Sequence, residues 1–203
     1  MRFASAFLLS AAFAGLAILV AAGAFTGLDQ WAIDHVMPGG RFTGGAPTVL
    51  DALIPFSSTH WDSVWSIAVN VVTLPASFVV AVVLIAWRSR VLAVAMIVAV
   101  AVETLTKDAL TRPALDHDGR HVVAFDNSFP SGHTLRIVIV ASAFLSPWWT
   151  AWAVVSIALL QLAGWHTPSD IAGGLVLGCL ALLGARGAAR ALGARGLPRS
   201  RAA

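Results

Sequence analysis

Residues 129–145 read FPSGHTLRIVIVASAFL, a short polar segment that passes directly into an apolar run. His133 and Arg136 stand three residues apart, so a helix that starts near Pro130 places them on one face. Charged side chains are costly in lipid and therefore face a protein interior or a watery cavity. The segment predicts a membrane-type helix whose polar start belongs to a site.

The rest of the chain is similarly apolar. Of its 203 residues, 58% are hydrophobic and 11% are charged, whereas soluble domains have about 25% charged residues. The hydrophobic residues form several long runs, which indicates a polytopic membrane protein. The net charge is +3, but the basic residues stand beside apolar runs, so nucleic acid is not an expected partner. A single cysteine, Cys179, excludes an intramolecular disulfide.

Six apolar segments are candidates for membrane spans. A span needs about 20 residues, whereas the apolar part of a signal peptide has about 7–15. The first segment is therefore expected to be an uncleaved helix, and a signal peptide cleaved near AAGAF is the alternative. The sequence predicts one domain over residues 1–192 and a basic cytoplasmic tail over 193–203. The expected spans are residues 3–25, 65–87 (with a kink at Pro75), 91–110, 132–148, 150–165 and 171–192.

The loop over residues 26–62 contains two glycine pairs, and a short interfacial helix is expected near LDQWAIDHV. His35, Arg41 and His60 in this loop either touch substrate or line an interface, and the sequence does not decide between these roles.

Basic residues assign the two sides of the membrane. In a six-span arrangement one side receives Arg2, Arg88, Arg90 and the tail arginines 186, 190, 195, 199 and 201. The positive-inside rule makes this side the cytoplasm. The predicted fold is therefore an all-α integral membrane protein with six transmembrane helices, both termini cytoplasmic and the site at the extracytoplasmic end.

Three polar clusters meet at that end. Lys107 and Arg112 lie at the end of the helix predicted over 91–110. The next predicted helix begins at Pro130-Ser131-Gly132-His133, and GWHTPSD (164–170) connects the last two predicted helices. A helix start offers unpaired N–H groups and a positive dipole end, which bind anions. His166 with Asp170 suits a nucleophile and the carboxylate that orients it, and His133 suits a proton donor.

Each of these residues also has a structural interpretation. Thr167 to Asp170 is a capping box with proline at the first helical position, so Asp170 would only cap the last helix. Lys107 would pair with Glu103 at the i−4 position, Arg136 would reach the headgroups, and each histidine would be an interface residue. The convergence of the clusters favours a site.

The motifs resemble those of the phosphatidic acid phosphatase type 2 superfamily, in its bacterial membrane lipid phosphatase branch. Residues 130–133 match its Pro-Ser-Gly-His motif, and His166 with Asp170 matches the end of its third motif. Two departures make this chain a variant. Lys107 precedes Arg112-Pro113 by four residues rather than six, and Leu159-Leu160 stand where the third motif has Ser-Arg. Arg136 is the first candidate to replace the missing phosphate-binding arginine, and Arg120 is the second.

The resemblance implies hydrolysis of a lipid-linked phosphate monoester or diphosphate, on a polyprenyl or phospholipid, at the outer face of the cell membrane. No cofactor or metal is implied, and the histidines and aspartates show no zinc-ligand spacing. His166 would form a phosphohistidine, Asp170 would orient it and His133 would protonate the leaving group. The phosphate would be held by Lys107, Arg112, Ser131, Gly132 and Arg136.

Two other functions remain open. A degenerate member that binds phospholipid headgroups without turnover would explain the missing arginine, although binding alone needs no nucleophile. A transporter would also use six spans, but transporters place their sites at mid-membrane depth. The sequence indicates neither an oligomeric state nor which lipid phosphate is the substrate, and the expected partners are this substrate and membrane lipids.

Overall fold

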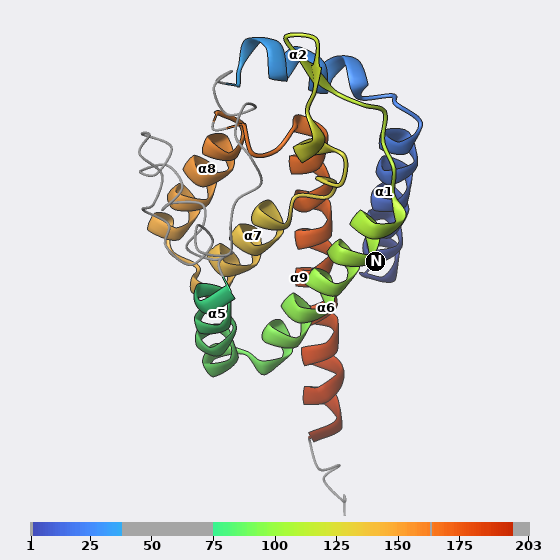
Figure 1. The fold of residues 1–203 in the computed structure, drawn as a ribbon. Coiled ribbons are helices and arrows are strands. Elements are labelled where there is room, and N and C mark those ends of the chain that lie inside the picture. Colours follow the sequence, from blue (N-terminus) through green and yellow to red (C-terminus); the bar gives the residue numbers. More distant parts are fainter. Residues whose placement is uncertain (1, 38–74, 163, 197–203) are drawn as a thin grey trace, which may run out of the picture.

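The computed structural model describes residues 2–37, 75–162 and 164–196, which are mainly helical (Figure 1). This confirms the predicted all-α class. The described helices are α1 (Arg2–Ala21), α2 (Thr26–His35), α5 (Pro75–Arg88), α6 (Arg90–Ala109), α7 (Gly132–Phe144), α8 (Pro147–Leu162) and α9 (Pro168–Gly196). Between α6 and α7 lie a small hairpin, β1 (Asp116–His117) and β2 (Arg120–His121), and a 3-10 turn, η2 (Val123–Phe125).

Helix α9 is the centre of the bundle and contacts α1, α6 and α7 (Figure 1). Its glycines let α7 approach closely, as small residues do between membrane helices. A Cβ atom at Gly174 would lie 2.4 Å from the carbonyl oxygen of Ser131, and one at Gly178 would lie 3.1 Å from Cγ1 of Val138. The starts of α7 and α9 are therefore held side by side.

Several helix ends differ from the predicted boundaries. Helix α7 ends at Phe144 rather than 148, because Leu145 adopts a left-handed conformation (φ 41°) and Pro147 disfavours a helical residue before it. The first expected span ends at Ala21, where the chain bends by 73° into α2. Helix α9 continues to Gly196, beyond the expected end at residue 192.

The described residues do not by themselves establish six membrane spans. By length and composition one helix, Pro168–Gly193, is long and apolar enough to cross a membrane, and the bent pair Ser5–Ala21 and Thr26–His35 qualifies as a second if it is taken as one span. Helix α7 has only 13 residues, or about 20 Å at 1.5 Å per residue. The expected span 65–87 lies partly outside the described residues, since α5 begins at Pro75.

Helix α2 lies across the end of the bundle at which α9 begins (Figure 1). Its Gln30 side chain donates to the backbone oxygen of Asp116 (2.6 Å) and accepts from the backbone N–H of the same residue (3.0 Å). Ile33 and Met37 pack into a buried cluster with Leu115, Val122 and Phe125. The predicted short helix in the first loop is thus present, and it is docked on the segment that leads into α7.

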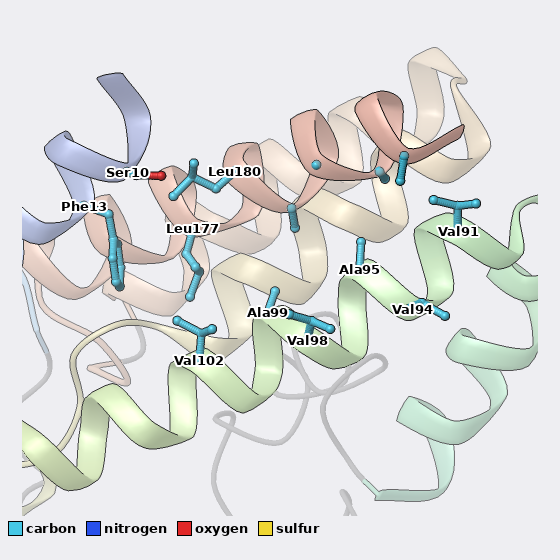
Figure 2. Close-up of a pocket in the computed structure, with 14 residues that line it drawn as sticks. Ser10, Phe13, Val91, Val94, Ala95, Val98, Ala99, Val102, Leu177 and Leu180 are labelled. Atoms are coloured by element: carbon cyan, nitrogen blue, oxygen red, sulfur yellow. The ribbon is translucent and has the colours of Figure 1, made fainter. Parts of the chain in front are cut away.

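An apolar groove of about 500 Å³ runs along the side of the bundle, between α1, α6 and α9 (Figure 2). Ser10 is the one lining residue with a polar side chain. Val102 also lines a second hollow of about 480 Å³, which follows α1 and α6 as far as Thr111. The lining of this second hollow therefore continues past the end of α6 to Thr111, the residue that precedes Arg112.

Candidate active site

The two motif histidines meet between the start of α7 and the turn that precedes α9. His133 Nδ1 lies 3.1 Å from His166 Nε2, within hydrogen-bonding distance. The rings of Trp165 and His133 pack edge to face, with their centroids 5.1 Å apart. His166 is 6% exposed and His133 is partly buried. Two residues 33 positions apart in the sequence therefore share one hydrogen bond, as the convergence of motifs predicted.

Asp170 caps α9 and also lies behind His166. Its Oδ2 accepts from the Thr167 N–H at 3.0 Å, and the Thr167 hydroxyl faces the Asp170 N–H at 3.4 Å, which is the reciprocal pattern of a capping box. The same Oδ2 is 3.6 Å from His166 Nδ1, a buried nitrogen with no hydrogen-bond partner in this structure. Catalytic hydrogen bonds are often this long before substrate binds. The structural and the functional interpretations of Asp170 are therefore compatible.

Ser131 is the N-cap of α7. Its buried hydroxyl oxygen accepts from the N–H of Thr134 (3.2 Å) and from the Thr134 hydroxyl (3.0 Å). Its own backbone N–H donates to the carbonyl oxygen of Asp170 at 2.9 Å. Ser131 therefore links the two helix starts and caps α7 with its hydroxyl oxygen.

A buried carboxylate occupies the start of α7. Glu103 accepts from Lys107 Nζ at 2.7 Å, and its Oε2 is 3.2 Å from Arg136 Nη2. It lies so close to Gly132 that a Cβ atom there would be 2.0 Å from Oε1. Arg136 points back along α7, as long helical side chains do, and its Nη1 would be 2.5 Å from the same Cβ. The structure thus gathers Lys107, Gly132 and Arg136 in one place and adds Glu103 as their counter-ion.

Arg112 is in a different environment from the one predicted. Its side chain is 3% exposed, and each terminal nitrogen meets a carboxylate: Nη1 donates to Asp170 Oδ1 at 3.0 Å, and Nη2 donates to Asp29. Asp29 belongs to α2, is fully buried, and also accepts from the Ser169 N–H (3.0 Å) and hydroxyl (2.6 Å). Arg112 is therefore held by two acids beside the start of α9.

Asp29 is the residue that sequence reasoning missed. Its signal was available in the sequence of α2, because Asp29, Ala32 and Ile33 follow the i, i+3, i+4 spacing of one helix face and all three are buried. An acid on an apolar face needs a partner.

The remaining candidates lie away from the histidines. Arg120 is an exposed residue of the hairpin, so the structure favours Arg136 over Arg120 as a replacement for the missing arginine. Leu159 and Leu160, at the position of that arginine, are buried in the core. His35 is exposed and contacts the Trp31 carbonyl oxygen. Arg41 and His60 lie outside the described residues. Within the described ranges no three His, Cys, Asp or Glu side chains are grouped as metal ligands would be.

A histidine backed by a carboxylate, beside cations at a helix start, suits the transfer of a phosphoryl group. The comparison with family models agrees with this chemistry, because the model of the PAP2 superfamily matches residues 88–190, about half of the chain, and the chain belongs to this superfamily. The match contains both histidine motifs and leaves out α1 and α2. Comparisons with curated proteins and with solved structures gave no significant match. Membership supports phosphoric ester hydrolysis as the activity class.

Proposed function

We propose that this chain is a membrane phosphatase that hydrolyses a lipid-linked phosphate monoester or diphosphate through a phosphohistidine. The observation that carries the proposal is the contact between His133 and His166 (3.1 Å), with Asp170 behind His166. Residues of two separate motifs supply a nucleophile, an orienting carboxylate and a proton donor at one point, and headgroup binding alone needs none of these.

The reaction has two displacements. In the first, the lone pair of His166 Nε2 attacks phosphorus, the bond from phosphorus to the lipid oxygen breaks, and His133 gives that oxygen a proton. In the second, water attacks phosphorus, the P–N bond breaks, phosphate leaves and His133 recovers a proton. Asp170 holds Nδ1 of His166 through both steps. Lys107, Arg136 and the N–H groups at the Gly132 end of α7 stabilise the charge on the phosphoryl oxygens.

The histidine contact must open for this reaction. An in-line arrangement of nucleophile, phosphorus, leaving oxygen and proton donor spans roughly 7 Å between the two ring nitrogens. In the structure these nitrogens are 3.1 Å apart. Substrate binding therefore separates the rings and frees the attacking lone pair of His166.

A lipid substrate is supported by the surface of the bundle. Large aliphatic side chains are exposed along α6 and α8, among them Val94, Ile97, Leu105 and Val154, and soluble monomers rarely expose such surface in contiguous form. The apolar groove of Figure 2 offers room for an alkyl chain beside the same helix that carries Lys107.

We infer that six helices cross the membrane, with the site on the extracytoplasmic side. Arg88 and Arg90 flank the turn between α5 and α6, and Arg186 and Arg190 of α9 line a hollow with Ser5 of α1. These arginines belong to the end of the bundle opposite α2, which the positive-inside rule assigns to the cytoplasm. Reporter fusions at both termini test this topology.

The activity is tested by phosphate release from a panel of polyprenyl and phospholipid phosphates, in detergent with EDTA present. We expect release by the native chain and by His121→Ala, a matched control in the exposed hairpin, and none by His166→Ala. Activity should fall on both sides of a pH optimum, because one histidine must be neutral and the other protonated. A flat profile from about pH 5 to 9 would contradict this division of roles.

A second function rests on a specific observation. Leu159 and Leu160 replace the third-motif Ser-Arg, and Arg112 is bound by acids. These two features favour a chain that binds lipid phosphates without turnover. Binding without release from any substrate of the panel would establish it.

A further inference from the structure

A chain of buried charges connects α2 to the histidine pair. Asp29 binds Arg112, Arg112 binds Asp170 Oδ1, and Asp170 Oδ2 faces Nδ1 of His166. Asp29 and Asp170 are fully buried, and the Arg112 side chain is 3% exposed. Charge interactions in such an interior are screened far less than at a surface.

The sum of these charges matters for His166. The two carboxylates and one guanidinium together carry one net negative charge. Among the described contacts, His166 is the only titratable ring that lies next to this group, on the far side of Asp170 from Arg112. When Nε2 of His166 bonds to phosphorus, its imidazole becomes a cation that carries its proton on Nδ1. A net negative group behind Nδ1 stabilises that cation, and a neutral Asp170–Arg112 pair would not.

We propose that Asp29 is a positioning residue for the phosphoryl transfer, acting through Arg112. It takes one arm of the guanidinium, so that Arg112 does not neutralise Asp170 alone. It also fixes the start of α9 through the N–H and hydroxyl of Ser169, one residue before Asp170. The inference rests on the proposed function, and it gives Arg112 a role behind the nucleophile in place of a phosphate contact.

The test uses variants that change charge with little change of shape. In Asp29→Asn the amide oxygen still accepts from Ser169, but the net charge of the group becomes zero. We expect kcat to fall about ten- to hundredfold, the range found when the partners that orient metal-binding histidines are removed. KM should stay within about threefold, whereas the melting temperature should fall, because an amide N–H2 replaces the buried oxygen that accepts from Arg112 and from the Ser169 hydroxyl. Asp34→Asn, on the exposed side of the same helix, is the matched control and should keep native kcat.

The double variant Asp29→Asn with Arg112→Gln separates this role from simple structural support. Removing both charges restores one net negative charge at Asp170, so kcat should recover at least severalfold over Asp29→Asn. If Arg112 contacted the phosphate, the double variant would instead lose further activity and its KM would rise more than about tenfold.

Each outcome decides the inference. Recovery in the double variant supports it, even if Asp29→Asn alone is also less stable. Native kcat in Asp29→Asn, or a further loss in the double variant, overturns it while the activity of the native chain upholds the proposed function. No turnover by the native chain overturns both.

Discussion

The close approach of α7 and α9 makes a quantitative prediction at Gly174. In Gly174→Ala the new methyl carbon would lie 2.4 Å from the Ser131 carbonyl oxygen and 2.8 Å from Thr134 Cβ, whereas ordinary contacts begin at 3.4 Å. The shortfall from the oxygen is 3.4 − 2.4 = 1.0 Å, and the obstacle is backbone, so α9 must withdraw. Overpacking of this kind costs about 1–3 kcal/mol.

The matched control is Gly187→Ala on the same helix, where the methyl would meet nothing within 4 Å. Both substitutions share the gain in helix propensity, so their difference isolates the clash. At about 2–4 °C per kcal/mol for a chain of this size, Gly174→Ala should melt about 2–12 °C below the control. The measurement is a thermal unfolding curve of each purified variant in the same detergent.

The same withdrawal should reduce activity. Ser131 N–H binds the Asp170 carbonyl oxygen, so a shift of α9 displaces the residues around His166 relative to His133. A misplacement near 1 Å costs on the order of a hundredfold in rate. Equal melting temperatures and equal phosphate release for the two variants would refute the described approach of the helices and the link between packing and catalysis.

Three further predictions concern charged residues. Arg136→Ala should lower kcat/KM by about 10²–10³-fold, since it removes a charged transition-state contact. The control Arg120→Ala, in the exposed hairpin, should keep kcat/KM within about twofold of native, and similar losses in both variants would reject Arg136 as the replacement arginine. Glu103→Gln should strengthen inhibition by inorganic phosphate severalfold in a competition assay, because two cations lose their internal anion, and weaker inhibition would show that Glu103 only orients them. The side-chain hydrogen bond to Asp126 raises the pKa of His121 above its ordinary value of 6.5. The stabilisation by this contact is therefore fully present below pH 6.5 and is lost as the pH rises through the raised pKa. An NMR titration should show a lower pKa for His121 in Asp126→Asn.

The sequence was sufficient for the helical class and for the two histidine motifs. The apolar runs set the helices, and Pro-Ser-Gly-His with His166 and Asp170 is specific enough to identify the superfamily to which the chain belongs. The local pairings were also readable, since Lys107 with Glu103 and the capping box at Thr167 depend only on residues three or four positions apart.

Long-range pairings were not readable from the sequence. Arg112 and Asp29 are 83 positions apart, and nothing local shows that the start of α9 brings a second acid to the same arginine. The position of Arg112 after Lys107 predicted a phosphate ligand, because a motif comparison transfers the role of a residue without information on the residues around it. The end of α7 was also not predictable from hydropathy. The apolar run continues past Phe144, whereas the left-handed backbone of Leu145 ends the helix.

If α7 crosses the membrane as proposed, its shortness has a consequence for the depth at which the site lies. A helix of 13 residues covers about 20 Å, against a hydrocarbon thickness of about 30 Å. A bilayer meets such a mismatch by thinning locally or by admitting water and headgroups to greater depth. Because His133 stands at the start of this helix, the water and headgroups would reach this greater depth above the histidine pair. A lipid phosphate would then reach the nucleophile by descending with its own leaflet, without leaving the bilayer.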